Sequence, residues 1–270
     1  MSTPEAPAAG AQRIAAAFSR PGRRAALMPY LMGGFPEMES SRAIGRAYAD
    51  AGADLVELGV PYSDPLADGP VIQAAGTRAL RSGATLDGVL GVCEDLTPRL
   101  PVVLMVYANM VYARGLEAFT AALRDAGACG LIVPDLPIEE APLVLDACDA
   151  AGLALVPLVA PTSPDERMSR IGARARGFLY TVAVTGITGE RAALEDSWAP
   201  IVARARAHTA VPVALGFGIA TSEQARAAAD AGADGVIVGT RLVRAVAEHA
   251  DDPAAAVREL VAGLAAGLDA

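Results

Sequence analysis

The segment from Asp50 to Gly59, DAGADLVELG, joins the end of an alanine-rich helical pattern to a short apolar strand. Its first glycine suits a helix end in the left-handed conformation, so that the strand starts directly after a tight turn. Similar turns occur at Asp125–Cys129 before GLIVPD and at Asp230–Asp234 before GVIVG, with a looser copy at Asp149–Gly152 before LALVPLVAP. The sequence therefore predicts repeated helix–turn–strand units.

Apolar strands and amphipathic helices alternate along the rest of the chain. Further strands are expected at Ala25–Met32, Val102–Tyr107, Gly177–Val182 and Val211–Leu215, which brings the number to about eight. Eight such units over about this length favour a (β/α)8 barrel over a doubly wound sheet, which stays the alternative. Against that alternative, no G-x-G-x-x-G follows the first strand. We predict one α/β domain, a TIM barrel with an extra N-terminal helix.

The domain boundaries follow from composition. Residues 1–12 are expected to form a flexible tail and residues 13–270 the single barrel domain, because no linker or change of composition divides them. The extra helix is expected over Ile14–Ser19, ahead of the first strand. Three further helix starts are expected from capping patterns, at Ser163–Glu166, Thr221–Gln224 and Asp252-Pro253.

The charged residues exclude several classes of function. The chain of 270 residues carries a net charge of −9, which argues against a general nucleic-acid or anionic-membrane binder. All 22 basic residues are arginine, which removes lysine Schiff-base chemistry. The two histidines, His208 and His249, lie far apart in helical contexts, so a histidine-based metal site or catalytic triad is not expected.

The cysteines and apolar segments bear on location. Cys93, Cys129 and Cys148 are odd in number and lack C-x-x-C spacing, which fits reduced thiols. The N-terminus lacks the basic flank and apolar core of a signal peptide, and the longest apolar run, Leu153–Pro161, is too short to span a bilayer. We therefore expect a cytoplasmic protein.

Glu57 interrupts an otherwise apolar strand and is the first candidate for acid–base chemistry. Burial disfavours the charged form of a carboxylate, so its pKa is expected to rise toward the range of a proton donor near neutrality. The alternative is a structural carboxylate paired with an arginine. In the loop beyond, Asp64 and Asp68 are further candidates, although Asp beside Pro or Gly is also ordinary turn chemistry.

Glycine pairs after the last two strands indicate a phosphate site. Gly216-Phe217-Gly218 follows the seventh strand and Gly239-Thr240 the eighth, where backbone amides and a helix start bind phosphate in barrels. The segment Thr185–Glu190, after the sixth strand, is expected to be a mobile loop that closes over a ligand, or else a plain surface loop. Arg241 either adds positive charge near the phosphate or points to solvent.

These motifs resemble the tryptophan synthase alpha subunit family. The segment DLVELGVPYSDPLADGPVIQ is similar to the family's signature around its catalytic glutamate. VYANMVY, VPDLP, VTGITG, GFGI and GVIVGT follow in the family's order and spacing. Together with Leu27–Pro36, they cover most of the chain from about residue 13.

The resemblance implies a cofactor-free barrel that cleaves indole-3-glycerol phosphate to indole and glyceraldehyde 3-phosphate. It assigns Glu57 as the general acid–base and Asp68 as the stabiliser of the positively charged indole nitrogen. Tyr180 would lie beside the glutamate, and Thr188 would position Asp68. The implied phosphate-binding set is Gly189, Gly216, Phe217, Gly218, Gly239 and Thr240. Tyr30 and Tyr107 would line the indole pocket.

Three positions depart from the commonest pattern of that family. Thr240 stands where many members have serine, Arg241 where a small residue is usual, and Phe35 where aspartate is frequent. None of the three belongs to the acid–base pair.

The resemblance also implies a partner, a beta subunit that carries pyridoxal phosphate (PLP) and joins the indole to serine in an alpha2-beta2 complex. Loops around Tyr62–Pro65 and Tyr107–Val111 would form the interface. Two alternatives stay open, another phosphate-binding barrel enzyme and a non-catalytic barrel subunit. Metal-dependent enzymes of the first kind need histidines at strand ends, and the second would not need Glu57, Asp68 and the loop glycines.

Overall fold

We describe a computed structural model of the chain, which places residues 9–182, 198–216 and 218–270. Its parallel strands are β1 (Ala26–Met32), β2 (Val56–Gly59), β3 (Val102–Met105), β4 (Gly130–Ile132), β5 (Ala154–Val156), β6 (Leu158–Val159), β7 (Leu179–Val182), β8 (Val213–Gly216) and β9 (Gly235–Val238). The helices before β5 are α1 (Ala9–Phe18), α2 (Met38–Asp50), α3 (Pro70–Arg81), α4 (Leu86–Leu96), α5 (Ala108–Arg114), α6 (Leu116–Asp125) and α7 (Ala141–Ala151). Those after β6 are α8 (Asp165–Gly172), α10 (Trp198–Arg206), α11 (Ser222–Asp230), α12 (Thr240–Glu248) and α13 (Pro253–Gly267).

The strands form a closed barrel, as the sequence predicts. Their order is β5-β4-β3-β2-β1-β9-β8-β7-β6, and every pairing is parallel. The run LALVPLVAP, expected as one strand, is divided at Pro157, which has no amide hydrogen for the ladder. Residues before this proline pair with β4 and residues after it pair with β7, so the two short strands together close the ring.

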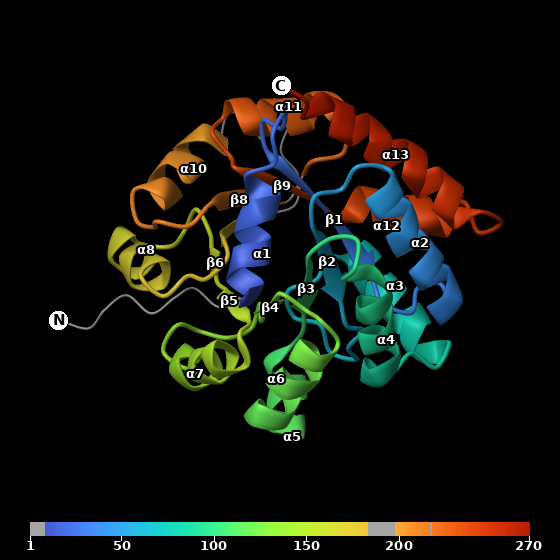
Figure 1. The fold of residues 1–270 in the computed structure, drawn as a ribbon, viewed down its shortest axis with the longest axis horizontal. Helices are drawn as coiled ribbons and strands as arrows, with labels where there is room; N and C mark the ends of the chain where they lie inside the picture. The colour runs from blue at the N-terminus through green and yellow to red at the C-terminus, as the bar shows by residue number, and fades with distance from the viewer. Residues whose placement is uncertain (1–8, 183–197, 217) are drawn as a thin grey trace.

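Helices surround the barrel on all sides (Figure 1). The larger apolar core lies between strands and helices, and a second cluster fills the barrel interior with side chains such as Met28, Val103 and Ile237. The glycines of the four repeated turns adopt positive φ angles of 97°, 78°, 76° and 95° at Gly52, Gly127, Gly152 and Gly232. The repeated turn chemistry is therefore confirmed.

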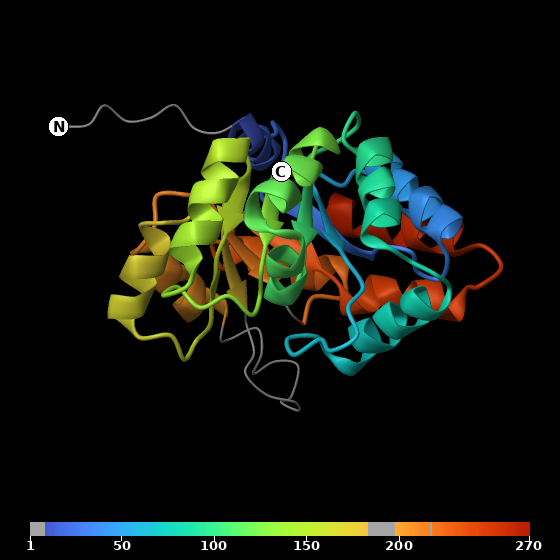
Figure 2. The same ribbon diagram turned by 90° about the horizontal axis from the view of Figure 1, so that it is seen from below.

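The N-terminal helix closes one end of the barrel. Figure 1 shows α1 across the strands, in the middle of the ring of helices, and Figure 2 shows it at one edge of the barrel. Its Ile14 is fully buried in the interior cluster. The helix begins at Ala9, earlier than the expected Ile14, because Gly10 packs against the turns around it and its amide donates to the carbonyl of Gly152 at 3.0 Å.

Two of the three expected helix caps form. The side chains of Thr221 and Asp252 accept from Gln224 N and Ala255 N. The expectation for Ser163 is wrong, because Pro164 occupies the cap position of α8 and Ser163 Oγ instead accepts from Ala160 N at 3.1 Å. The hydroxyl therefore closes the turn that precedes the helix.

The three cysteines form no disulfide bond. Cys93, Cys129 and Cys148 are free and buried, in agreement with reduced thiols. Within the described parts of the chain, no helix combines the length and apolar character needed to cross a bilayer.

Candidate active site

A cavity of about 620 Å³ opens at the carboxyl ends of the strands. Side chains from β1, β2, β3, β6, β7 and β9 reach it, and so do the loops that follow β2, β4, β6 and β8. The carboxyl-terminal face is the face on which barrels of this kind carry their ligand sites. The acid–base candidates, several of the glycines and both arginines discussed below all meet there.

Glu57 lies in the cavity wall with only 3% of its surface exposed. Burial, reinforced by the nearby negative charge of Asp68, raises the pKa of its carboxyl to about 8. Among the described residues its Oε2 atom has no hydrogen-bond partner. A protonated, unpaired carboxyl in a cavity is suited to donating its proton to a ligand, because no internal bond competes for it.

The contrast with Asp54, three residues earlier, argues against the structural alternative for Glu57. Asp54 is also buried, but its carboxylate forms ion pairs with Arg20 at 2.7 Å and Arg23 at 3.3 Å. It also accepts from Leu27 N at 2.8 Å. No arginine of the described segments is paired with Glu57. Asp54 therefore holds the start of β1 and β2 together, while Glu57 has no such ion pair within the described residues.

Two buried tyrosines flank Glu57, and each reaches its place over a glycine. A Cβ atom on Gly59 would lie 2.0 Å from the hydroxyl oxygen of Tyr30, and one on Gly216 would lie 2.5 Å from that of Tyr180. Burial and the charges of the two carboxyls raise the pKa of both phenols, so they stay protonated. The strand-end glycines thus make space for neutral hydroxyls beside the acid.

Asp68 enters the cavity from the loop between β2 and α3 and is backed by Tyr107. Burial raises the pKa of Asp68, and a hydrogen bond from the Tyr107 hydroxyl opposes that rise. The Tyr107 hydroxyl also accepts from Ala67 N at 3.0 Å, and its ring stacks on Tyr62 at 5.1 Å between centroids. Tyr107 therefore contacts Asp68 and holds its loop, and its predicted place in the indole pocket stays a prediction.

The late strands supply the opposite wall. Gly218, Gly239 and Thr240, three of the residues predicted to bind phosphate, line the cavity, and α12 begins there. Gly216 does not line it, because it packs against the ring of Tyr180. The remaining expected residues, Thr188, Gly189 and Phe217, and the loop Thr185–Glu190 lie outside the described residues.

Positive charge at this wall comes from two arginines on one face of α12. Arg241 and Arg244, one helical turn apart, both line the cavity. Neither takes part in an ion pair within the described residues, in a chain whose arginines are mostly paired. For metal ions the described residues offer no cluster of three or more histidine, cysteine, aspartate or glutamate side chains.

The model of the family described as tryptophan synthase alpha chain matches residues 17–267. The chain belongs to this family. Curated tryptophan synthase alpha chains from Prochlorococcus marinus (strain MIT 9313) and Gloeobacter violaceus (strain ATCC 29082 / PCC 7421) are 50% and 46% identical to it. The first alignment covers 84% of this chain and 83% of the relative, and the second covers 93% and 91%.

Solved structures agree with that membership. A tryptophan synthase chain from M. tuberculosis superposes with a TM-score of 0.88 at 38% identity and covers 96% of this chain and 98% of its own. A chain of the tryptophan synthase a2b2 complex from Pyrococcus furiosus gives a TM-score of 0.85 at 33% identity, with 90% and 98% covered. These similarities confirm both the family and the barrel expected from the sequence.

Two features of the site were missed in the sequence. Arg244 was not selected, although its spacing of three residues from Arg241 places both on one helix face. Ser163, taken as a helix cap, lines the cavity together with Ala160. No local pattern identifies that second pair, because their position depends on the closure of the barrel between β6 and β7.

Proposed function

We propose that this tryptophan synthase alpha chain cleaves indole-3-glycerol phosphate to indole and glyceraldehyde 3-phosphate, with Glu57 as the acid–base and Asp68 as its electrostatic partner. The observation that carries the proposal is the buried Glu57, whose Oε2 has no hydrogen-bond partner among the described residues and which shares a cavity with a second carboxyl. Two carboxyls in different environments are a recurrent means of dividing acid and charge-stabilising roles.

Glu57 acts first as an acid. With a pKa raised to about 8 it holds a proton at neutral pH, and it donates this proton to C3 of the indole ring. The ring becomes a positively charged iminium, which is an electron sink. Glu57, now a carboxylate, takes the proton of the hydroxyl on the adjacent side-chain carbon. The O–H electrons form the aldehyde, the carbon–carbon bond breaks and its electrons return to the ring.

Asp68 stabilises the positive ring nitrogen as a carboxylate that accepts its N–H. Burial raises the pKa of Asp68, and the hydrogen bond from Tyr107 supports this role because it opposes that rise by favouring the charged form. The protonated Tyr30 and Tyr180 supply donors near Glu57 without adding charge. Apolar side chains such as Ile72, which lines the same cavity, enclose the flat ring.

The phosphate end of the substrate is placed at the wall formed after β8 and β9. Gly218 and Gly239 allow close approach to backbone amides, and the start of α12 adds its dipole. The pair Arg241 and Arg244 supplies positive charge to a protein with a net charge of −9. Gly189, Gly216 and Phe217 complete the phosphate-binding set proposed from the family resemblance. The same resemblance assigns Thr188 to positioning Asp68.

The partner is a beta subunit that carries PLP and receives the indole in an alpha2-beta2 complex. Two exposed apolar side chains, Leu66 on the loop that follows β2 and Tyr112 on α5, support a docking surface there. Leu66 is 87% exposed and Tyr112 is 46% exposed. Water-exposed apolar surface of this kind is typical of a protein–protein contact. The chemistry of the alpha reaction itself is assigned to side chains of this chain, with no bound cofactor.

The test is indole release from indole-3-glycerol phosphate by the purified chain, with and without a beta subunit. We expect slow release alone and a strong increase in the complex, since binding of the partner favours the closed state. Glu57→Gln, which keeps the shape of the side chain but has no titrating proton, is expected to abolish release in both conditions.

The matched control is Glu139→Gln, at a surface carboxylate that is paired with Arg167 and does not line the cavity. This variant is expected to keep wild-type release. Full activity in Glu57→Gln, or the absence of release from the wild-type complex, would overturn the proposal.

A further inference from the structure

The turn between β6 and α8 forms part of the cavity wall and is internally braced. Its residues Ala160 and Ser163 both line the cavity. Ser163 N donates to Ala160 O at 2.9 Å, while Ala160 N donates to Ser163 Oγ at 3.1 Å. These two reciprocal bonds fix the shape of the turn. They do not fix its position relative to the barrel, because both join residues of the turn itself.

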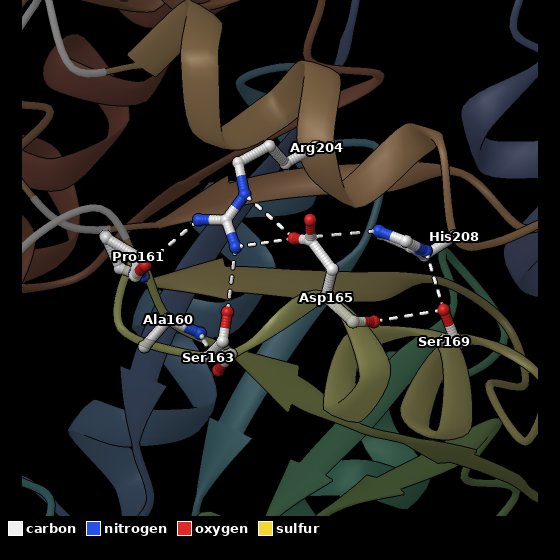
Figure 3. Close-up of polar contacts among 7 residues, drawn as sticks. All are labelled: Ala160, Pro161, Ser163, Asp165, Ser169, Arg204 and His208. Carbon is white, nitrogen blue, oxygen red and sulfur yellow. Dashed lines mark hydrogen bonds and ion pairs between the residues drawn. The ribbon is translucent and has the colours of Figure 1, made fainter.

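Arg204, on α10, supplies the external attachment (Figure 3). One guanidinium nitrogen, Nη1, donates to Pro161 O at 3.0 Å, and Nη2 donates to Ser163 O at 2.9 Å. The guanidinium thus holds two carbonyls of the same turn in a fork, a geometry that a lysine does not reproduce. Arg204 does not itself line the cavity. It acts on the wall from behind.

A second set of contacts holds the guanidinium from the side of α8. Nε and Nη2 of Arg204 lie 3.2 and 2.8 Å from Asp165 Oδ1, and His208 Nε2 lies 3.8 Å from the same oxygen. His208 Nδ1 also contacts Ser169 Oγ at 2.8 Å, as Figure 3 shows. The Asp165 side chain is 68% exposed, so water screens this ion pair strongly. The partly buried carbonyl contacts therefore carry the attachment.

We propose that Arg204 is a positioning residue of the alpha reaction, which sets the cavity wall formed by Ala160 and Ser163 where the indole ring binds. This inference rests on the proposed function. The turn continues directly from Leu158 and Val159, which line the cavity as apolar side chains. The glycines and arginines assigned to the phosphate lie after other strands, β8 and β9. A displaced turn therefore changes the fit of the ring and leaves phosphate binding intact.

The reverse reaction separates the two ends of the substrate. Condensation of indole with glyceraldehyde 3-phosphate, by the full chain in complex with a beta subunit and without serine, gives one KM for each. We expect Arg204→Gln to raise the KM for indole by about fivefold or more, the usual effect of losing hydrogen bonds of ordinary strength. We expect the KM for glyceraldehyde 3-phosphate to stay within about twofold.

Arg206 provides a matched control on the same helix. Its guanidinium donates to Gly232 O at 3.0 and 2.8 Å and pairs with Asp234, at the turn before β9 and away from the cavity. The side chains of Arg204 and Arg206 are exposed to similar degrees, 39% and 48%. Arg206→Gln is therefore expected to leave both KM values unchanged, even if it lowers stability.

The outcomes are distinct. An unchanged KM for indole in Arg204→Gln, or equal increases in both KM values, overturns the inference, because the first denies an effect on the wall and the second indicates general damage. If the glutamine variant does not fold, Arg204→Lys tests the inference in its place. Its KM for indole is expected to lie between that of wild type and the value expected for Arg204→Gln. Absence of condensation by the wild-type complex contradicts the proposed function instead.

Discussion

Replacing Glu57 with glutamine is expected to stabilise the protein, and the gain is expected to grow with pH. The carboxyl has a pKa of about 8 in the folded chain and 4.5 as its ordinary value. Between these two values the unfolded chain is ionised while the folded chain is protonated, so folding takes up a proton. Wild-type stability therefore falls as pH rises from 4.5 to 8. Glutamine carries no such proton and removes this fall.

The size of the effect follows from the displacement of the pKa. One pKa unit corresponds to about 1.4 kcal/mol. Relative to a chain in which Glu57 keeps its ordinary pKa, the free energy of unfolding of the wild type is therefore lower by about 3 kcal/mol at pH 7 and by less than about 1 kcal/mol at pH 5. Urea unfolding followed by circular dichroism at the two pH values measures the difference. The difference in unfolding free energy between Glu57→Gln and wild type is expected to grow, in favour of the variant, by about 2 to 3 kcal/mol from pH 5 to pH 7.

Glu139→Gln serves as the control, because the pKa of Glu139 is shifted in the opposite direction. Hydrogen bonding to Arg167 lowers the pKa of Glu139, so its carboxylate contributes stability above its ordinary pKa and loses it as pH falls. The Glu139→Gln variant is expected to show no increase in unfolding free energy over wild type at pH 7. If Glu57→Gln and wild type have the same dependence of stability on pH, the carboxyl is not shifted by burial, and the argument for a neutral acid at pH 7 fails.

Three further substitutions test other parts of the structure. Gly216→Ala places a Cβ 2.5 Å from the Tyr180 hydroxyl, and the displaced ring is expected to lower kcat roughly tenfold or more in the indole-release assay. Arg244→Gln is expected to raise the KM for indole-3-glycerol phosphate by about fivefold at low salt, with a smaller effect in high salt. An unchanged KM at low salt would contradict the role of α12 in phosphate binding. Ile14→Ala leaves a void in the barrel interior and is expected to cost about 2 to 5 kcal/mol of unfolding free energy, measured by urea titration.

The barrel could be predicted because its repeated turns are local. The glycine between a helix and a strand is visible in the sequence, and in the structure each of the four copies has a positive φ angle. The four copies define the alternation that makes a (β/α)8 fold. The break at Pro157 is a local effect too, but its result, a ring closed by two short strands, depends on partners far away in the chain. The early start of α1 likewise depends on Gly10 packing against distant turns.

The candidate site likewise has features that the local sequence predicts and features that depend on distant parts of the chain. Glu57 is recognisable because a charged residue interrupts an apolar strand, and burial in the structure accounts for its raised pKa. The hydrogen bonds of Tyr107 to Asp68 and Ala67 could not be predicted, because the sequence does not show which loop a ring on a neighbouring element contacts. Arg204 carries no sequence signal, since its contacts are to backbone carbonyls of another segment.

The burial of Ile14 bears on the order in which the chain acquires its structure. A ribosome releases α1 before any strand of the barrel, yet the interior cluster that buries Ile14 also includes Ile237, which is made more than two hundred residues later. The helix therefore lacks part of its final cluster until β9 has been made. Contacts so distant in sequence are slow to form. In this barrel a helix that is made before every strand is thus among the last elements to be locked in place.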